Sequence, residues 1–250
     1  MPTGAFLIAR IDSKRLPGKN MLEILGKPMI ALLAERVSYS SLVDKVVIAT
    51  STAKSDDPLE ELAARLGLDC FRGSLENVME RVACAARHFK CNTVIEILGD
   101  NPLVHSDLID DVLNLYRQRK FDYAATVTKE YPVSPLQFKL FSVGIRVQVY
   151  SLRAAERWRE YPDYLNVPAK STSAYIFEHT QEFKAGYLEA KGRWAFMHKP
   201  DFNLAVNYAK NFELVRRVFE KNYIQDKNFS LQKVYAQLND EPHLLSLMGN

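Results

Sequence analysis

Short apolar runs alternate, along the first half of the chain, with segments whose apolar residues recur at helical spacing. The largely apolar runs are 5–9, 45–50, 93–98 and 122–127. Continuous apolarity, rather than alternation with polar residues, is typical of strands that are covered on both faces. The pattern therefore predicts four buried strands of a mainly parallel sheet.

Helical patterns fall between and after these runs, at 27–39, 57–67, 74–89 and 106–119. In the second of them Asp57 is placed to cap the helix, Pro58 to occupy its first position and Gly67 to end it. Strands and helices thus alternate over residues 4–128. This order predicts an α/β fold with an open, doubly wound sheet.

The second half of the chain is less regular. A strand is predicted at 144–150 and a short strand at 202–206, before an amphipathic helix over 207–221. No stretch has the composition of a linker, and no internal repeat is visible. We therefore expect one domain over 1–250, with an insertion at 130–200 and a C-terminal strand and helices over the last fifth of the chain.

Composition narrows the class of protein. The chain is 47% hydrophobic and 25% charged, which excludes disordered and fibrous classes. No apolar run is long enough to cross a bilayer and residues 1–15 lack the apolar core of a signal peptide, so the cytoplasm is the expected location. A net charge of +3 gives no argument for nucleic acid or a membrane as a partner. The three cysteines lack metal-binding spacing and are expected to be inert thiols.

The densest charge lies in the loop ARIDSKRLPGKN, which follows the first strand. It contains the cations Arg10, Lys14, Arg15 and Lys19, with Asp12 among them. Neither a glycine-rich dinucleotide fingerprint nor a Walker motif is present. Arginine offers paired donors to phosphate oxygens, and lysine a mobile charge. The loop is either a phosphate site or a solvated basic loop, and its position at the end of a parallel strand favours phosphate.

The loops after Ala9, Thr50 and Leu98 should meet at the carboxyl edge of the sheet, where such folds bind ligands. The third contains Asp100, which suits a hard cation such as Mg²⁺ or, alternatively, the cap of a turn or helix.

Two further positions carry weaker signals. Ser74 begins a helical pattern whose N-terminus would hold an anion or a polar base edge, or is simply an ordinary capped helix. Asn207 ends the short strand and is expected to cap the helix that follows.

Together these segments resemble the bacterial cytidylyltransferases that make CMP-activated sugars. The N-terminal signature of that family is similar to ARIDSKRLPGKNMLEILGKPMI. The segments VDKVVIATS, FRGSLENVMERV and ILGDNPLVHSDLID resemble, in order and spacing, the group of spore-coat polysaccharide biosynthesis protein F, relatives of CMP-sialic acid and CMP-Kdo synthetases. The segment HKPDFNLAVNYAKNFELVRRVFE resembles its C-terminal signature. The likeness covers residues 4–150 and 196–220.

The resemblance implies a Rossmann-like nucleotidyltransferase fold that uses CTP and Mg²⁺, with 4–128 as the nucleotide-binding half and 201–250 as the C-terminal strand and helices. An acceptor oxygen would attack the α-phosphorus of CTP and release pyrophosphate. By position, Arg10, Lys19 and Asp100 would be catalytic, and Asp100 and Asn207 would hold the metal. The nucleotide contacts carried over are Ala9, Arg10, Ser13, Arg15, Lys19, Ala49, Thr50, Arg72, Ser74 and Gly99, with Arg72 and the Ala49–Thr50 edge near the cytosine.

Three residues depart from the family pattern. Asp12 stands where the family has glycine, Gln148 where a glutamate is usual, and Asn207 where an aspartate would be the second metal ligand. Asp12 then either supplies a compensating carboxylate for an enzyme with an unusual acceptor, or the acceptor pocket has diverged toward a polyol phosphate or phosphonate. A third possibility is a catalytically weak CTP-binding protein with a degraded metal site.

The resemblance implies an acceptor that is a sugar, a sugar acid or a related phosphorylated molecule, used in bacterial surface-glycan biosynthesis. Acceptor specificity would lie in 130–200, where the available polar residues are Arg146, Gln148, Lys170 and Tyr175. The same stretch corresponds in position to dimer contacts of relatives, so a homodimer is expected.

Overall fold

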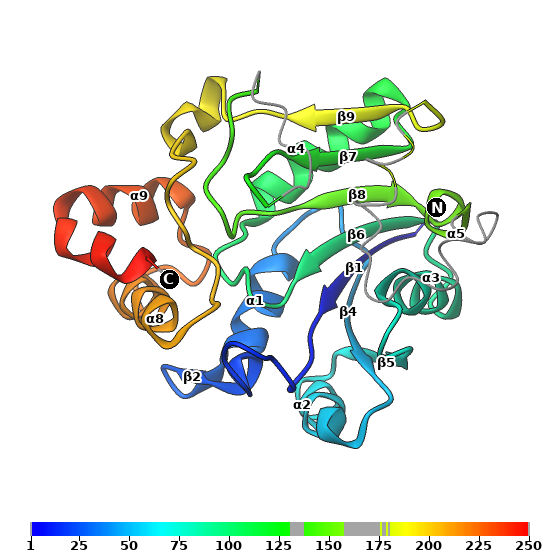
Figure 1. Ribbon diagram of the computed structural model, residues 1–250, viewed down its shortest axis with the longest axis horizontal. Helices are drawn as coiled ribbons and strands as arrows, with labels where there is room; N and C mark the ends of the chain where they lie inside the picture. Colours follow the sequence, from blue (N-terminus) through cyan, green and yellow to red (C-terminus); the bar gives the residue numbers. More distant parts are fainter. Residues whose placement is uncertain (1, 131–137, 158–175, 177–178, 180, 250) are drawn as a thin grey trace.

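A computed structural model of the chain describes residues 2–130, 138–157, 176, 179 and 181–249 (Figure 1). One sheet has the strand order β5-β4-β1-β6-β8-β7-β9. Its strands are β1 (Thr3–Ile8), β4 (Lys45–Ser51), β5 (Asp69–Gly73), β6 (Thr93–Leu98), β7 (Tyr123–Thr126), β8 (Gln148–Ser151) and β9 (Ala185–Leu188). All paired neighbours run parallel except β8, which is antiparallel to both β6 and β7. The predicted α/β fold with a mainly parallel sheet is confirmed.

Helices cover both faces of the sheet (Figure 1). The helices are α1 (Met29–Ser38), α2 (Asp57–Leu66), α3 (Val78–His88), α4 (Ser106–Arg119), α5 (Leu152–Glu156), α8 (Ala209–Asn222) and α9 (Leu231–Asp240). Side chains of α1, α2, α4, α8 and α9 share one apolar core, and those of α3 and α5 share the other. Successive side chains of β1 point into different cores, since Phe6 packs in the second core and Leu7 in the first. Two covered faces explain the continuous apolarity of the predicted strands.

Three helices begin at other residues than the sequence predicts. The cap of α2 is Asp56 rather than Asp57, and its side chain makes no capping hydrogen bond. The α3 helix begins after Asn77, whose side chain accepts from the Glu80 amide, and not at Ser74. The α8 helix begins after Tyr208, so Asn207 does not cap it.

These shifts have a local reason. The Ser74 hydroxyl accepts from the Asn77 amide at 3.0 Å, which closes a turn before α3 rather than starting the helix. Asn211 Oδ1 accepts from the amides of both Asn207 and Tyr208. A side chain from the first turn of α8 therefore bonds the backbone at the start of the helix, where Asn207 was expected to be the cap.

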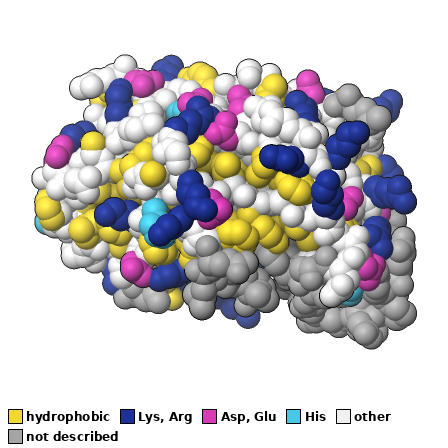
Figure 2. All heavy atoms as spheres, turned by 90° about the horizontal axis from the view of Figure 1, so that it is seen from above, with side chains coloured by type: hydrophobic (Ala, Val, Ile, Leu, Met, Phe, Trp, Pro, Cys, Tyr) yellow, Lys and Arg dark blue, Asp and Glu magenta, His cyan; other side chains and the backbone are white. Residues whose placement is uncertain are grey.

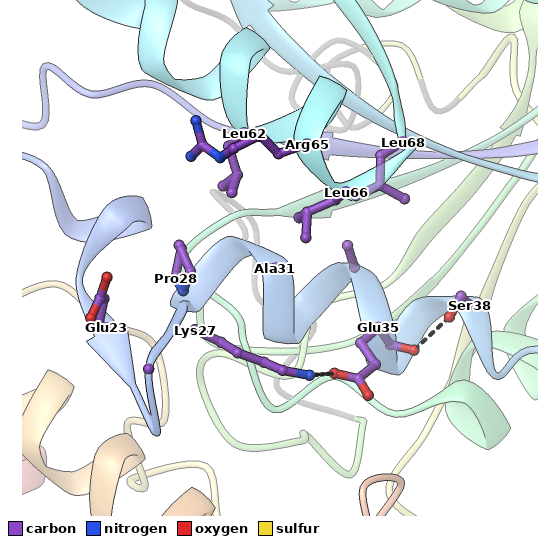
Figure 3. A pocket seen from close by; sticks show the side chains of 12 residues that line it. Glu23, Lys27, Pro28, Ala31, Glu35, Ser38, Leu62, Arg65, Leu66 and Leu68 are labelled. Atoms are coloured by element: carbon purple, nitrogen blue, oxygen red, sulfur yellow. Dashed lines mark hydrogen bonds and ion pairs between the residues drawn. The ribbon is translucent and has the colours of Figure 1, made fainter.

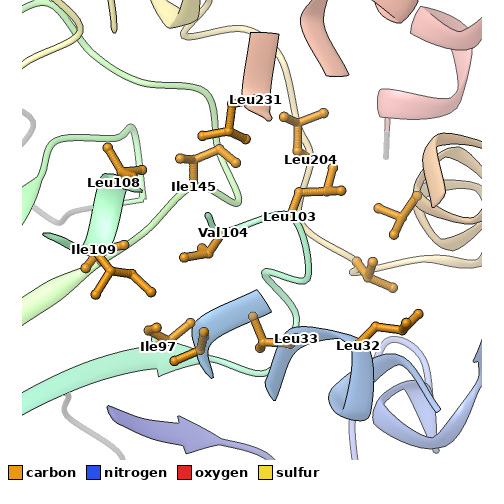
Figure 4. Close-up of a cluster of buried hydrophobic side chains, with 14 of the residues drawn as sticks. Leu32, Leu33, Ile97, Leu103, Val104, Leu108, Ile109, Ile145, Leu204 and Leu231 are labelled. Atoms are coloured by element: carbon orange, nitrogen blue, oxygen red, sulfur yellow. The ribbon is translucent and has the colours of Figure 1, made fainter. Parts of the chain in front are cut away.

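The prediction of a short strand at 202–206 is wrong. This segment makes only an isolated bridge between Val143 and Asn203 and does not join the sheet, and β8 begins at Gln148 rather than at residue 144. The segment is instead held by apolar packing. Leu204 meets Leu103 and Leu231 in a cluster that also contains side chains of α1 and α4 (Figure 4).

A small hairpin of β2 (Glu23–Ile24) and β3 (Lys27–Pro28) precedes α1. Neither this hairpin nor β9 was expected from the sequence, whereas α9 falls in the region 201–250 where C-terminal helices were expected. None of the described helices combines the length and the apolarity needed to cross a bilayer. On the face shown in Figure 2, basic, acidic and apolar side chains are interspersed rather than gathered by kind.

Candidate active site

The basic loop leaves the carboxyl end of β1 and closes on its own backbone. The amides of Ser13 and Gly18 both donate to the Ile11 carbonyl, at 2.8 and 2.9 Å. Gly18 has a positive φ of 70°, which favours glycine at this turn. The Asn20 side chain donates to the Arg10 carbonyl at 2.9 Å. The loop is therefore shaped before any ligand binds.

Two acids tie the basic loop to the connection between β4 and α2. Buried Asp56 accepts from the Ile11 amide at 2.7 Å and from the Ser51 hydroxyl at 2.5 Å. Burial alone would raise the pKa of Asp56, but these hydrogen bonds outweigh it and lower the pKa. Exposed Asp12 accepts from the Ser55 hydroxyl at 2.6 Å. The acid that interrupts the basic loop is thus bonded to the neighbouring loop.

A cavity of about 420 Å³ opens between the basic loop and the end of β6. Its lining is Ile8, Arg10, Asp12, Ser13, Lys14, Arg15, Lys19, Asn20, Leu98 and Asp100. Five predicted site residues, namely Arg10, Ser13, Arg15, Lys19 and Asp100, therefore lie around one space. Lys14 and Arg15 are exposed, and no described residue forms an ion pair with either. Free cations in a cavity suit a polyanionic ligand.

Lys19 and Asp100 form an ion pair in this cavity. Lys19 Nζ lies 2.6 Å from Asp100 Oδ2 and 2.9 Å from the Val206 carbonyl oxygen. The Val206 amide in turn donates to the Asp100 carbonyl at 2.8 Å. Lys19 is only 7% exposed, so its charge is fixed in place. The C-terminal segment that Leu204 anchors thus completes the site.

Gly99 allows the basic loop to approach the end of β6. A Cβ at this position would lie 2.7 Å from Asn20 Oδ1 and 3.0 Å from the Ile8 carbonyl oxygen. A larger residue would therefore move the loop. The two other predicted backbone contacts are nearby, since the Ala9 amide donates to the Ala49 carbonyl at 3.4 Å.

Buried polar atoms without a hydrogen-bond partner in the described part of the chain gather at the same edge. They include Asn20 Oδ1, Thr50 Oγ1, both side-chain amide atoms of Asn101, Asn207 Oδ1 and all three guanidinium nitrogens of Arg81. Leaving one such group unpaired costs about 1–3 kcal/mol. A group of them at one place indicates that a ligand or water completes their bonding.

Arg81 is a residue that the sequence analysis missed. Its side chain is 1% exposed, and burial together with the nearby Arg10 cation lowers the pKa of Arg81 to about 10. A signal was present, because Arg81 directly precedes Val82 on the buried stripe of an amphipathic helix. Because the charged residue Glu80 is adjacent, the sequence pattern alone does not decide which of the two side chains faces the interior.

Arg72, expected near the cytosine, lies beside Thr50 in the strand register. Its guanidinium is occupied by protein groups. It forms ion pairs with Asp57 and Glu60 at 2.7 and 2.9 Å, and its other nitrogens donate to two carbonyls of the β4–α2 connection. Arg81 therefore has donors to offer a ligand, whereas Arg72 would have to give up existing bonds.

The oxygen donors at the end of β6 suit a hard dication. Asp100 offers a carboxylate, and Asn207, which follows Val206, has a buried amide oxygen that no described residue bonds. Mg²⁺ commonly takes one or two carboxylates and fills its shell with phosphate oxygens and water. No group of three or more His, Cys, Asp or Glu side chains that could hold a metal occurs among the described residues. These residues therefore fit a cation that arrives with a polyphosphate.

A second cavity, of about 440 Å³, lies between α1 and α2 (Figure 3). Its lining combines apolar residues with four charged ones, Glu23, Lys27, Glu35 and Arg65, of which Lys27 and Glu35 bond to each other at 2.9 Å. No unpartnered buried polar atom of the described residues lines it. This cavity lacks the chemistry found at the strand ends. Lys170 and Tyr175, considered for the acceptor, lie outside the described residues.

The chain is similar in sequence and in fold to known proteins. A family model described as cytidylyltransferase matches residues 5–236. The chain is 25% identical to spore coat polysaccharide biosynthesis protein SpsF of Bacillus subtilis, over 85% of this chain and 84% of that protein. It is 35% identical to 3-deoxy-manno-octulosonate cytidylyltransferase of Synechococcus elongatus, over 51% of this chain and 52% of that protein. In fold it is similar to a cytidylyltransferase of Leptospira borgpetersenii, with a TM-score of 0.81, 22% identity and coverage of 98% and 97%.

Proposed function

The chain belongs to the cytidylyltransferase family, and we propose that it transfers CMP from CTP to an acceptor oxygen of a sugar or sugar acid, with release of pyrophosphate. Family membership makes it a nucleotidyltransferase. The observation that carries the finer proposal is the Lys19–Asp100 pair in a cavity that is also lined by the exposed cations Lys14 and Arg15. That cavity combines a phosphate-binding cation with a carboxylate suited to a metal.

Displacement at phosphorus needs positioning and charge neutralisation rather than a protein nucleophile. Arg10 and Arg15 would each give paired donors to the triphosphate oxygens. Lys19 would turn from Asp100 to a phosphate oxygen when the triphosphate enters. Asp100 and Asn207 would hold Mg²⁺, which when bound supplies charge neutralisation at the phosphates.

Arg81 would bind the base. Cytosine presents two acceptors side by side, its carbonyl oxygen and its unprotonated ring nitrogen. A guanidinium has donors only, arranged in a planar fork that matches such an edge. Uracil carries a hydrogen on that ring nitrogen, so the same fork would meet a donor. Support for this assignment is the buried guanidinium whose three nitrogens have no partner among the described residues.

The test is ligand-induced stabilisation, with CTP, UTP, ATP and GTP at equal concentration and with Mg²⁺. We expect CTP to raise the melting temperature most, because binding to the folded state stabilises it by mass action. Equal shifts for all four nucleotides would remove the cytidine assignment. No shift with any would reject nucleotide binding altogether. Pyrophosphate release with a panel of acceptors then tests the transfer.

One observation favours a second candidate, a catalytically weak CTP-binding protein. Asn207 offers a neutral oxygen beside a single carboxylate, and an amide is a weaker ligand for a hard dication than a carboxylate. CTP binding without pyrophosphate release from any acceptor would support it. The proposal also includes a polyol phosphate or phosphonate as the alternative acceptor. The homodimer and the cytoplasmic location rest on resemblance and composition.

A further inference from the structure

Arg36 of α1 is a buried cation that forms no ion pair with any described residue. It is 0% exposed, and burial lowers the pKa of Arg36 to about 10, although the nearby Asp226 carboxylate acts in the opposite direction. Its three guanidinium nitrogens donate to main-chain carbonyls, at 3.1 Å to Val104, 3.4 Å to Leu103 and 3.2 Å to Phe229. Because a buried charge without an ion-pair partner is costly, the segments that it bonds indicate its role.

Two of these carbonyls belong to the loop between β6 and α4, which contains Asp100. This loop makes two consecutive turns, in which the Asn101 amide donates to the Leu98 carbonyl at 3.0 Å and the Val104 amide to the Asn101 carbonyl at 3.2 Å. Asp100 lies inside the first turn, and Arg36 bonds the end of the second. The backbone that carries the Asp100 carboxylate is therefore held from the side of α1.

The third carbonyl belongs to the connection between α8 and α9, and His105 joins this connection to the β6–α4 loop. His105 Nδ1 accepts from the Asp107 amide at 3.1 Å, so Nε2 is the nitrogen that donates to the Asn228 carbonyl, also at 3.1 Å. Arg36 Cζ lies 4.3 Å from the centre of the Phe229 ring, within the range of a cation–π contact. The guanidinium thus lies where α1, the β6–α4 loop and the α8–α9 connection meet.

We infer that Arg36 is a positioning residue for CMP transfer, because by bonding the end of the β6–α4 loop it holds the Asp100 carboxylate in the cavity beside the basic loop. The inference rests on the proposed function. Arg36 is too deeply buried to touch a ligand, so it acts only through this backbone. Groups that are fixed before the ligand binds need no reorganisation during the reaction. A lysine would bring one nitrogen to three carbonyls, instead of a planar fork of donors.

The test compares Arg36→Met and Arg36→Lys with the unaltered protein. Without the guanidinium, two carbonyls of the β6–α4 loop lose their partner and the loop should open more often, so the Asn101 and Val104 amides should exchange their hydrogens faster in the ligand-free protein. The Mg²⁺ concentration for half-maximal pyrophosphate release should rise roughly 10- to 100-fold in Arg36→Met, and less in Arg36→Lys. The affinity for CTP without Mg²⁺ should not change, because the basic loop is untouched.

Val112→Ala is the control for a loss of stability. Val112 is buried in α4, in the same apolar core as α1, and lies outside the β6–α4 loop. This variant should destabilise the fold without altering the Mg²⁺ requirement. If Arg36→Met does not fold, His105→Ala decides the question, because it removes a bond between the same loop and the α8–α9 connection. It should raise the Mg²⁺ requirement by a smaller factor.

An unaltered Mg²⁺ requirement in a folded Arg36→Met, or a rise of the same size in Val112→Ala, would overturn the inference and leave the proposed function standing. Loss of CTP affinity without Mg²⁺ in the Arg36 variants would overturn it as well, because Arg36 would then support the fold as a whole. Failure of the unaltered protein to bind CTP would instead reject the proposed function.

Discussion

Lys19 and Asp100 neutralise each other across 2.6 Å, although one is the expected phosphate ligand and the other the expected metal ligand. They come from different loops, and the Val206 carbonyl also accepts from the lysine. If the proposed roles hold, nucleotide and metal would have to separate a pair that is already formed. The pair keeps two charges satisfied in a largely buried place, where an isolated charge would be costly.

Lys19→Met is predicted to act in opposite directions on the two ligands. Asp100 loses its competing cation, so the variant should bind Mg²⁺ alone more tightly, while its affinity for CTP falls roughly tenfold or more. Calorimetric titration with each ligand measures both. Lys45→Met, which breaks the exposed pair with Asp69 on β5, is the matched control and should alter neither affinity. Weaker binding of both ligands would show that Lys19 only supports the fold.

Asp100→Asn is predicted to lower pyrophosphate release at least about 100-fold, because the developing phosphate charge would lose the carboxylate that we propose as the Mg²⁺ ligand. Binding of CTP in the absence of Mg²⁺ should persist, since the cations of the basic loop are untouched. Asp107→Asn, exposed in the first turn of α4, serves as the control. Unchanged turnover in Asp100→Asn would place the metal elsewhere.

Asp12 has two separable properties, its charge and its hydrogen bond from Ser55. Asp12→Ala removes both, and Ser55→Ala removes only the bond. We predict that Asp12→Ala tightens CTP binding several-fold, because an acid leaves the lining of a phosphate cavity. Ser55→Ala should leave the affinity unchanged and lower the free energy of unfolding by about 0.5–1.5 kcal/mol. Loss of turnover in Asp12→Ala alone would indicate that the acid contributes to catalysis.

The features that could be predicted from the sequence are those that leave a pattern within a short stretch of residues. Strands with two covered faces, a positive-φ glycine ending α2 and a cation-rich loop after β1 each leave a local pattern, and the structure has all three. The convergence of the loops after β1 and β6 followed from the rule that parallel strands end at one edge.

Contacts between distant segments left no local pattern. The inward direction of Arg81 depends on how α3 packs against the sheet, and the Val206 carbonyl that bonds to Lys19 belongs to a segment whose Leu204 packs in the core. The 202–206 segment has the composition of a strand, but it lies outside the sheet. Burial and tertiary partners, rather than propensity, decide such cases.

Asp56 gives a prediction for pH. Its pKa is lower in the folded than in the unfolded chain, so its contribution to stability is present above the unfolded value of about 4 and is lost as the pH falls through the folded value. Asp56→Asn should therefore lower the free energy of unfolding by about 1–3 kcal/mol at pH 7. The difference from the unaltered protein should shrink below pH 4. Denaturant unfolding at several pH values measures it, with Asp57→Asn, whose pair with Arg72 is more exposed, as the comparison.

Arg81→Met is predicted to separate stability from binding. Removing a buried guanidinium that has no hydrogen-bond partner among the described residues should raise the free energy of unfolding of the ligand-free protein by about 1 kcal/mol or more. The same change should weaken CTP binding roughly tenfold or more and reduce the preference for CTP over UTP. Melting curves with and without each nucleotide measure both effects.

Arg87→Met on the same helix, exposed and paired with Glu156, controls for the loss of an arginine. It should change neither the CTP affinity nor the preference over UTP. If Arg81→Met destabilises the ligand-free protein while the nucleotide preference stays intact, the guanidinium serves the packing of α3 and not the base. If the preference for CTP over UTP falls together with the CTP affinity, the ligand that Arg81 binds explains why a charge is buried there at a cost in stability.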